Sequence, residues 1–265
     1  MNYDSVMAKV SVIIPVYNVE LYLESCLNSV INQTLDGVQI ICINDGSKDK
    51  SAEILEKYRT YENVEIVDIE NSGASKARNV GLSKVNADYI SFVDSDDTIP
   101  NDYLESLYCH AKESNVDIIM TGFNFLRNSS IQPYTSYASG VYESFVDKCS
   151  QILNGAIWDK MFKASLIKEH NLSFVEGRMW EDNLFILQAL YFSNAMKIVN
   201  KPRYNYRLNP NSVTNSPELR AKRVMDSRFI YDKTMEFARE QNMTSDEVQA
   251  VDLFLRNKAM PGYIN

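Results

Sequence analysis

The stretch YISFVDSDD, residues 89–97, decides the fold of this chain. Its first part, residues 89–93, is a short and mostly apolar run, which is typical of a strand buried in a parallel sheet. The run leads directly into Asp94, Asp96 and Asp97. Because ligands of parallel α/β sheets bind beyond the carboxyl ends of the strands, the position of these acids predicts a ligand site.

Strand-and-helix units also precede this stretch. Short apolar runs predict buried strands over residues 10–14, 38–43 and 64–69. Apolar residues at helical spacing predict helices over residues 19–31, 49–58 and 73–85. Such alternation predicts an α/β fold, with a mostly parallel, Rossmann-like sheet flanked by helices. The residues after the strands should then gather along one edge of the sheet, and they are 15–18, 44–47, 70–73 and 94–97.

The carboxyl-terminal half is less regular. A helix over 101–114 and a strand over 116–121 continue the pattern, and residues 128–140 are expected to form a loop or a pair of edge strands. Further helices are predicted over 145–153, 160–169, 181–193, 218–242 and 245–257, with short strands over 197–199 and 203–208.

Composition excludes several classes of protein. The 265 residues are 45% hydrophobic, which is enough for a sizeable core, and the net charge of -8 argues against a nucleic-acid-binding face. The four cysteines lack zinc-site spacing; Cys26 and Cys42 lie in apolar surroundings and are expected to be buried free thiols, as in a reducing compartment. No stretch approaches the roughly 20 apolar residues of a membrane span. We expect a cytoplasmic protein, with any membrane contact peripheral and at the inner face of the cell membrane.

The acidic cluster has more than one interpretation. Neighbouring carboxylates repel each other, and a hard divalent cation such as Mg²⁺ or Mn²⁺ would offset that repulsion. The alternative without a metal is an acidic turn before the next helix. DSDDT, residues 94–98, also fits the DxDxT signature of haloacid dehalogenase-like phosphatases, with Asp94 as nucleophile. That motif normally opens its domain, whereas strand-and-helix units precede it here.

Other segments give weaker signals. Asp45 could accept hydrogen bonds from a nucleotide base, or simply belong to an Asp-Gly turn, and Tyr17 could stack on a base. Residues 71–79 begin a helix with small residues, which suits phosphate binding or a solvated helix start. Glu181 and Asp182 follow Trp180; they could supply a general base, or be favoured by the helix dipole alone.

Together these segments resemble the family 2 glycosyltransferases, which have the GT-A fold. The matching strings are VSVIIPVYN (10–18), INDGSKD (43–49), NSGASKARNVGL (71–82), YISFVDSDD (89–97) and WEDNLF (180–185). WDKMFK (158–163) and YNYRLNPNSVT (204–214) are similar to segments of bacterial members that build cell-surface glycans. The resemblance covers about residues 8–215.

The resemblance implies inverting transfer of a sugar from a nucleotide diphosphate donor, most often UDP-linked, to a glycan or lipid-linked acceptor. It makes Asp182 the catalytic base, with Glu181 beside it, and gives Asp96 and Asp97 to a divalent metal, Mn²⁺ or Mg²⁺. The acceptor side falls on Trp158 and Trp180. Donor binding falls on Pro15, Val16, Tyr17, Asn18, Asp45, Ser72, Gly73, Lys76, Arg78, Asn79, Asp94 and Ser95.

The resemblance also predicts the domain organisation. Residues 1–215 would form the GT-A catalytic domain, with a nucleotide-sugar half over 8–122 and an acceptor half over 123–215. The resemblance does not cover residues 216–265, whose charged helical pattern predicts a helical extension that packs on the domain, forms a homodimer or docks on a membrane. This pattern ends without a helix stop signal, so we expect the extension to be truncated from a longer natural chain.

Two departures from the family pattern matter. The QxxRW motif of processive members is absent, which predicts transfer of single sugars. The segment 204–214 lacks the histidine with which some members hold the metal, so a third protein ligand is not identified. The remaining alternative is a non-catalytic, nucleotide-sugar-binding partner subunit; a dehydrogenase is disfavoured because no GxGxxG follows a strand.

Overall fold

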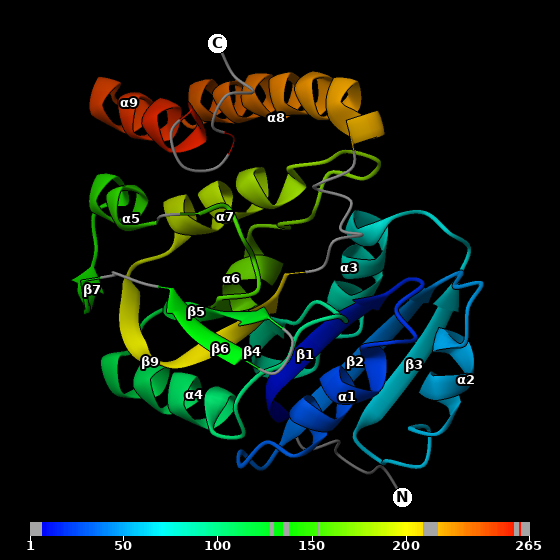
Figure 1. Ribbon diagram of the computed structural model, residues 1–265. Coiled ribbons are helices and arrows are strands. Elements are labelled where there is room, and N and C mark those ends of the chain that lie inside the picture. The colour runs from blue at the N-terminus through cyan, green and yellow to red at the C-terminus, as the bar shows by residue number, and fades with distance from the viewer. Residues whose placement is uncertain are drawn as a thin grey trace, which may run out of the picture.

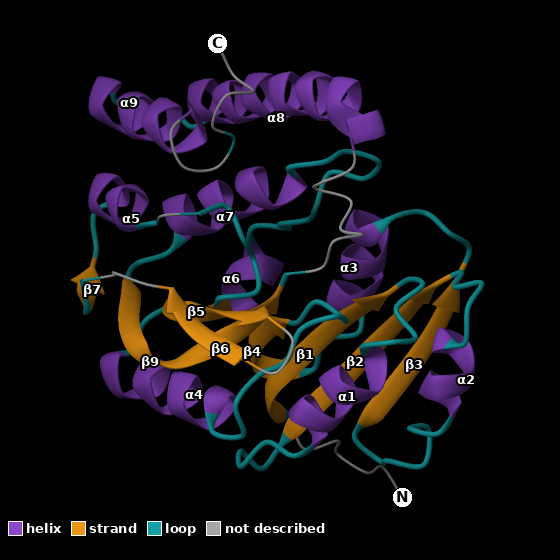
Figure 2. Cartoon of the chain, viewed as in Figure 1, coloured by secondary structure: helices purple, strands orange, loops and turns teal. Residues whose placement is uncertain are grey.

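The chain folds around one large sheet in the computed structural model, which describes residues 7–127, 130–134, 138–152, 154–208, 217–256 and 260. Within these residues, nine strands lie in the order β3-β2-β1-β4-β8-β5-β9-β7, with β6 paired to β5 (Figures 1 and 2). The strands are β1 (Ala8–Val16), β2 (Val38–Asp45), β3 (Val64–Ile69), β4 (Ala87–Phe92), β5 (Ile118–Arg127), β6 (Ser130–Tyr134), β7 (Gly140–Tyr142), β8 (Lys160–Lys163) and β9 (Met196–Arg207).

The amino-terminal part of the sheet is parallel, as predicted. β1 pairs in parallel with β2 and β4, and β2 pairs in parallel with β3. Successive residues of β1 point to opposite faces, so Val12 and Ile14 join the core on one side and Ile13 joins the core on the other. All three side chains are fully buried, because helices cover both faces of the sheet.

Each face has its own helices. Residues of α1 (Leu23–Ile31), α2 (Ser51–Glu56) and α4 (Tyr103–Ser114) belong to the core on the side of Val12. Residues of α3 (Ala74–Ser83), α5 (Phe145–Gln151), α6 (Ala164–Glu169) and α7 (Glu181–Phe192) belong to the core on the side of Ile13. The predicted α/β class, with helices on both faces, is confirmed.

The carboxyl-terminal half differs from the predicted elements at two places. The helix expected over 160–169 is wrong for its first four residues, which form β8 and pair antiparallel with both β4 and β5. Pairing on both sides outweighs the local helical pattern of this segment. The two short strands expected after residue 196 are one strand, β9, which runs parallel to β5.

The last helices pack on the rest of the domain. Figure 1 shows α8 (Arg220–Glu240) and α9 (Ser245–Phe254) as an outer layer above α5 and α7. The buried carboxylate of Asp226 in α8 accepts hydrogen bonds from Arg178 and from the backbone N–H of Met179, both at 3.0 Å. Packing on the domain was one of the predicted roles of this extension. In the part of the chain that the structure describes, no helix is long and apolar enough to cross a membrane.

Candidate functional site

Hydrogen bonds join the loops that follow the parallel strands β1, β2 and β3. These loops therefore lie together at one edge of the sheet, as predicted. The backbone N–H of Asn18, after β1, donates to Ser47 Oγ after β2 at 3.2 Å. The side-chain oxygen of Asn18 accepts from the backbone N–H of Lys48 at 2.8 Å. Asn18 adopts a left-handed conformation, φ 49°, which an asparagine tolerates and which turns the chain from β1 toward α1.

Asp45, at the end of β2, holds the next loop in the same way. Its two carboxylate oxygens accept the backbone N–H groups of Ser72 and Gly73 at 2.7 and 2.8 Å. Gly73 has φ 91°, a conformation that side chains disfavour, and no atom lies within 4 Å of the place where a Cβ would be. The loop before α3 is therefore fixed by Asp45 and open on the side of Gly73.

Arg78 in α3 is the centre of the site, and three carboxylates converge on it. Its Nη2 lies 3.1 Å from Asp94 Oδ1, and its Nη1 lies 3.1 Å from both Glu181 Oε1 and Asp182 Oδ1. The Arg78 side chain is 8% exposed, whereas the side chain of Asp182 is 21% exposed. The structure thus brings together residues that the sequence places in the donor and catalytic groups.

Burial shifts the proton affinities of this cluster. Removal from water raises the pKa of Asp182 to about 7, with further increases from the charges of Glu181 and Asp94, while Arg78 opposes the shift. Burial also raises the pKa of Glu181, again against the effect of Arg78. A carboxyl group that titrates near neutral pH is suited to accept a proton in a reaction.

Trp180 precedes these acids in a strained conformation. It is the residue before α7 and has φ 69°, which is rare for a bulky side chain. Strain of this kind costs roughly 1–3 kcal/mol and gathers at functional sites. Asp226 accepts a hydrogen bond from the backbone N–H of Met179, the residue before Trp180. After this turn, Glu181 and Asp182 both contact Arg78.

Asp97 differs from the other acids of its stretch. It is fully buried; its Oδ2 accepts the hydroxyl of Tyr204 at 2.8 Å and its Oδ1 accepts the backbone N–H of Arg207 at 2.6 Å. Burial, together with the charges of Asp94 and Asp96, raises the pKa of Asp97 well above its usual value. Both oxygens therefore fasten β9 to the acidic loop.

Arg207 is a site residue that the sequence analysis missed. Its Nε donates to the backbone carbonyl of Asp96 at 2.7 Å, and its guanidinium lies over the ring of Tyr22, 4.9 Å from the centroid. The positive charge of Arg207 thus lies at the acidic loop. The sequence does contain an indication of this role. Arg207 is the one cationic residue in YNYRLNPNSVT, the segment in which some family members have a metal-binding histidine.

Trp158 lies in the core, although an acceptor role was expected for it. It is 8% exposed, and its ring stacks on those of Tyr204 and Tyr206, with centroids 4.5 and 5.3 Å apart. Phe123 packs edge-on against it at 5.0 Å. Little of the ring is open to a sugar, so the structure gives Trp158 the part of a support for β9.

The other expected donor residues divide between the edge and its surroundings. Tyr17 is 44% exposed beyond β1, while Val16 and Ser95 are buried. Lys76 and Asn79 face the segment before α7: Lys76 lies 3.2 Å from Glu176, and Asn79 exchanges hydrogen bonds with the backbone of Phe174 at 2.8 and 2.9 Å. Pro15 lies in β1, opposite Ile43 of β2.

The acidic loop offers few protein ligands for a cation. Among the described residues, no group of three or more His, Cys, Asp or Glu side chains could hold a metal ion. Mg²⁺ often binds through one or two carboxylates and takes its other ligands from phosphates and water. Asp96, half-buried next to Asp94, is compatible with that kind of site.

Comparisons with known proteins place the chain in a family. The sequence profile described as "Glycosyl transferase family 2" matches residues 11–168. The EpsH protein of Bacillus subtilis is 30% identical over 93% of this chain and 74% of its own length. The glycosyltransferase GlyA of Streptococcus pneumoniae is 34% identical over 78% of this chain, but the chain spans only 31% of GlyA.

Similarity to a solved structure identifies the fold. Residues 1–349 of S. aureus TarS in complex with UDP-GlcNAc superpose with a TM-score of 0.75 at 24% identity, over 93% of this chain and 70% of the TarS chain. The fold is accordingly GT-A, as the resemblance implied. The chain is therefore a glycosyltransferase and belongs to glycosyl transferase family 2.

Proposed function

We propose that the protein is an inverting, non-processive glycosyltransferase that moves one sugar from a UDP-sugar to a hydroxyl of a glycan or lipid-linked acceptor. The observation that carries the proposal is the contact of Arg78 with both Asp182 and Asp94, which joins a candidate base to the loop at the donor edge. The UDP-GlcNAc bound to TarS, a protein of the same fold, supports a UDP-linked donor.

The reaction is a single displacement at the anomeric carbon. The acceptor oxygen forms a bond to that carbon, while the bond from the carbon to the diphosphate oxygen breaks and its electron pair leaves with the diphosphate. The hydroxyl proton passes to Asp182, whose exposed fraction of 21% and pKa of about 7 suit a general base. Attack from the face opposite the leaving group inverts the configuration.

Charge on the leaving diphosphate needs compensation. Arg78 is surrounded by Asp94, Glu181 and Asp182, so the cluster has more acids than its one guanidinium balances. A divalent metal, Mn²⁺ or Mg²⁺, held by Asp96 would supply positive charge to the diphosphate when bound. We leave Asp97 out of the metal site because it is fully buried and each of its oxygens already accepts a hydrogen bond, from Tyr204 or from Arg207.

Arg207 would provide a second positive charge beside the donor. Its guanidinium is held against the backbone of Asp96 and the ring of Tyr22, at the acidic loop. Planar guanidinium groups bind phosphate oxygens through paired hydrogen bonds. At the far end of the donor, exposed Tyr17 would stack on the base, beside Asp45 and the open side of Gly73.

The test is donor cleavage that depends on an acceptor. The protein is incubated with a panel of UDP-sugars and candidate glycan acceptors, with Mn²⁺, with Mg²⁺ or with a chelator, and UDP release is followed. Asp182→Asn should retain donor binding and lose transfer. Asp36→Asn, the same change at an exposed carboxylate before β2, should leave both unchanged.

Other outcomes would point to the alternatives. Release of inorganic phosphate from phosphomonoesters, with no UDP release, would favour a phosphatase that uses Asp94. Metal-dependent donor binding without turnover, across all acceptors, would favour a non-catalytic partner subunit. Normal transfer by Asp182→Asn would remove that residue from the role of base.

A further inference from the structure

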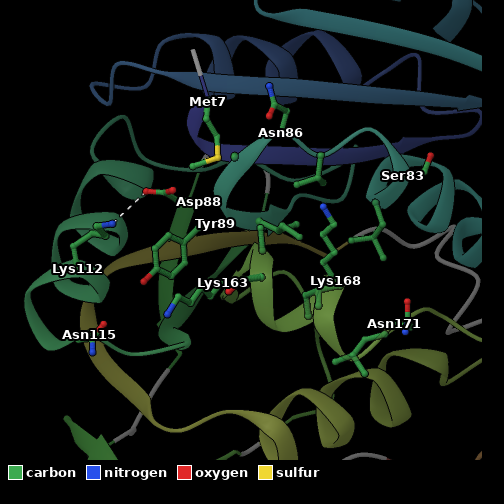
Figure 3. A pocket seen from close by; sticks show the side chains of 18 residues that line it. Met7, Ser83, Asn86, Asp88, Tyr89, Lys112, Asn115, Lys163, Lys168 and Asn171 are labelled. Atoms are coloured by element: carbon green, nitrogen blue, oxygen red, sulfur yellow. Dashed lines mark hydrogen bonds and ion pairs between the residues drawn. The ribbon is translucent and has the colours of Figure 1, made fainter. Parts of the chain in front are cut away.

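A cavity of about 810 Å³ lies at the amino end of β4, the opposite end from Asp94. Figure 3 shows its lining, which comes from the end of α3 and the start of β4, from the end of α4, and from β8 and α6. The volume falls in the range of roughly 300–1,000 Å³ that is usual for small-molecule sites. The residues that hold the proposed donor do not line it.

The charged side chains of this cavity are mostly positive. Lys112, Lys163 and Lys168, from three different segments, line it together with a single acid, Asp88 (Figure 3). Lys112 lies 3.3 Å from Asp88, and Lys163 lies 3.2 Å from Asp117 outside the lining. Among the described residues, Lys168 has no ion-pair partner.

Concentration of positive charge here contrasts with the chain as a whole, whose net charge is -8. Like charges gathered around one cavity raise its positive potential, and a bound anion offsets it. Lysine is a point-charge phosphate binder with three donors, so Lys163 can keep Asp117 and still bind a phosphate oxygen.

The rest of the lining combines aliphatic side chains with small polar ones, among them Ser83, Asn86 and Asn171. Leu82, Val85 and Ala164 are half-buried hydrophobic residues that pack on the core below, and Met7 at the rim is 57% exposed. The one aromatic residue of the lining, Tyr89, is only 3% exposed, so no ring face is offered to a sugar or a base. An aliphatic surface beside lysines matches a ligand that is part hydrocarbon and part anion.

We propose that this cavity binds an amphiphilic phosphate, with the phosphate group at Lys168 and an aliphatic chain along Leu82, Val85 and Met7. The site is separate from the donor edge, and the proposal does not depend on the proposed function. The same chemistry could come from a soluble phosphate ester or from a phospholipid head group.

The direct test is calorimetric titration of the full chain with octyl phosphate below its micelle-forming concentration. Inorganic phosphate and octyl glucoside serve as probes that lack the chain or the charge. Lys168→Glu should weaken octyl phosphate binding by about tenfold or more, because it replaces a positively charged hydrogen-bond donor by a carboxylate that repels the phosphate. Lys57→Glu, the same change at an exposed lysine after α2, should leave the affinity unchanged.

A second variant tests the cavity itself. Ser165→Trp places a large ring at an exposed lining position and should also reduce octyl phosphate binding, while thermal unfolding stays unchanged. UDP release should be normal in both variants, which separates this site from the donor site. Co-sedimentation with phosphatidic acid vesicles identifies the source: dependence on Lys168 there indicates a membrane lipid, and binding of soluble octyl phosphate alone indicates a soluble ester.

Three results would overturn the proposal. They are absence of octyl phosphate binding, equal affinities in Lys168→Glu and Lys57→Glu, and binding of inorganic phosphate or octyl glucoside as tight as that of octyl phosphate.

Discussion

Nη1 of Arg78 lies 3.1 Å from Oδ1 of Asp182, a residue 104 positions further along the chain. The same guanidinium contacts Glu181 and Asp94, so a single cation in α3 links the acidic loop after β4 to the start of α7. The side chains of Glu181 and Asp182 are 12% and 21% exposed and that of Arg78 is 8% exposed, so these charges stabilise one another away from most of the solvent. Arg78 therefore both positions the candidate base and lowers its pKa against the larger effect of burial.

Asp182 should set the pH dependence of transfer. Burial raises its pKa to about 7, and it can accept a proton only when ionised. The value of kcat/KM reports groups of the free enzyme. It should therefore rise with pH through a midpoint of about 7 and level off at higher pH. The measurement is initial UDP release against pH at limiting substrate. A profile that is flat through neutral pH would contradict the assignment.

Arg78→Met should move that midpoint to higher pH. The positive charge of Arg78 lowers the pKa of Asp182 against the larger effect of burial, so its loss leaves the carboxyl group harder to ionise. Removal of one partner of a buried ion pair also costs roughly 3–5 kcal/mol of unfolding free energy, measured by urea denaturation.

Two controls separate these effects. Arg59→Met, at an exposed arginine paired with Glu56 and Asp68, should cost far less stability than Arg78→Met and leave the pH profile in place. Arg78→Lys should recover part of the activity, because an ammonium restores the charge without reaching all three acids. An unshifted midpoint in Arg78→Met would show that Arg78 does not control the base.

Asp96→Asn and Asp97→Asn should behave differently toward metal. Asp96→Asn should remove most of the increase in donor affinity that Mn²⁺ gives, because an amide is a weaker ligand for a hard cation than a carboxylate. Asp97→Asn should preserve that increase and lower stability by about 1–3 kcal/mol, since the hydroxyl of Tyr204 loses its acceptor. UDP affinities with Mn²⁺ and with a chelator decide the matter; equal metal responses in the two variants would refute the distinction.

The sequence predicted the amino-terminal half well because its strands are buried on both faces and end in polar residues. Asn18, Asp45 and Arg78 could be assigned to one edge because that order follows from parallel strands. β8 was missed because pairing with β4 and β5, from distant parts of the chain, determines its conformation.

Long-range contacts also explain the errors in the site. Asp97 uses its carboxylate to bind Tyr204 and Arg207, whereas Asp96 contacts Arg207 through its backbone carbonyl. Both partners lie more than 100 residues further along the chain. The resemblance assigned Trp158 to the acceptor side, but the aromatic side chains of β9 stack on its ring. The order of residues in a motif does not show that Asp97 is buried while Asp96 is half-buried.

Gly81→Ala should destabilise the fold below the donor edge. A Cβ at Gly81 would overlap Cγ2 of Ile13, a fully buried residue of β1, so α3 would have to move away from the sheet. Overpacking of this kind costs roughly 1–3 kcal/mol, which alanine's helix propensity, worth about 1 kcal/mol over glycine, offsets only in part. Urea denaturation should show the loss.

A double-mutant cycle with Ile13→Ala identifies the cause. Ile13→Ala alone leaves a cavity and costs about 2–5 kcal/mol, whereas the added methyl group of Gly81→Ala would fill part of that space. The double variant should therefore lose less than the sum of the two single losses, as residues in contact do. Strict additivity would show that the clash with Ile13 is not the reason, and that the backbone of α3 itself requires glycine at position 81.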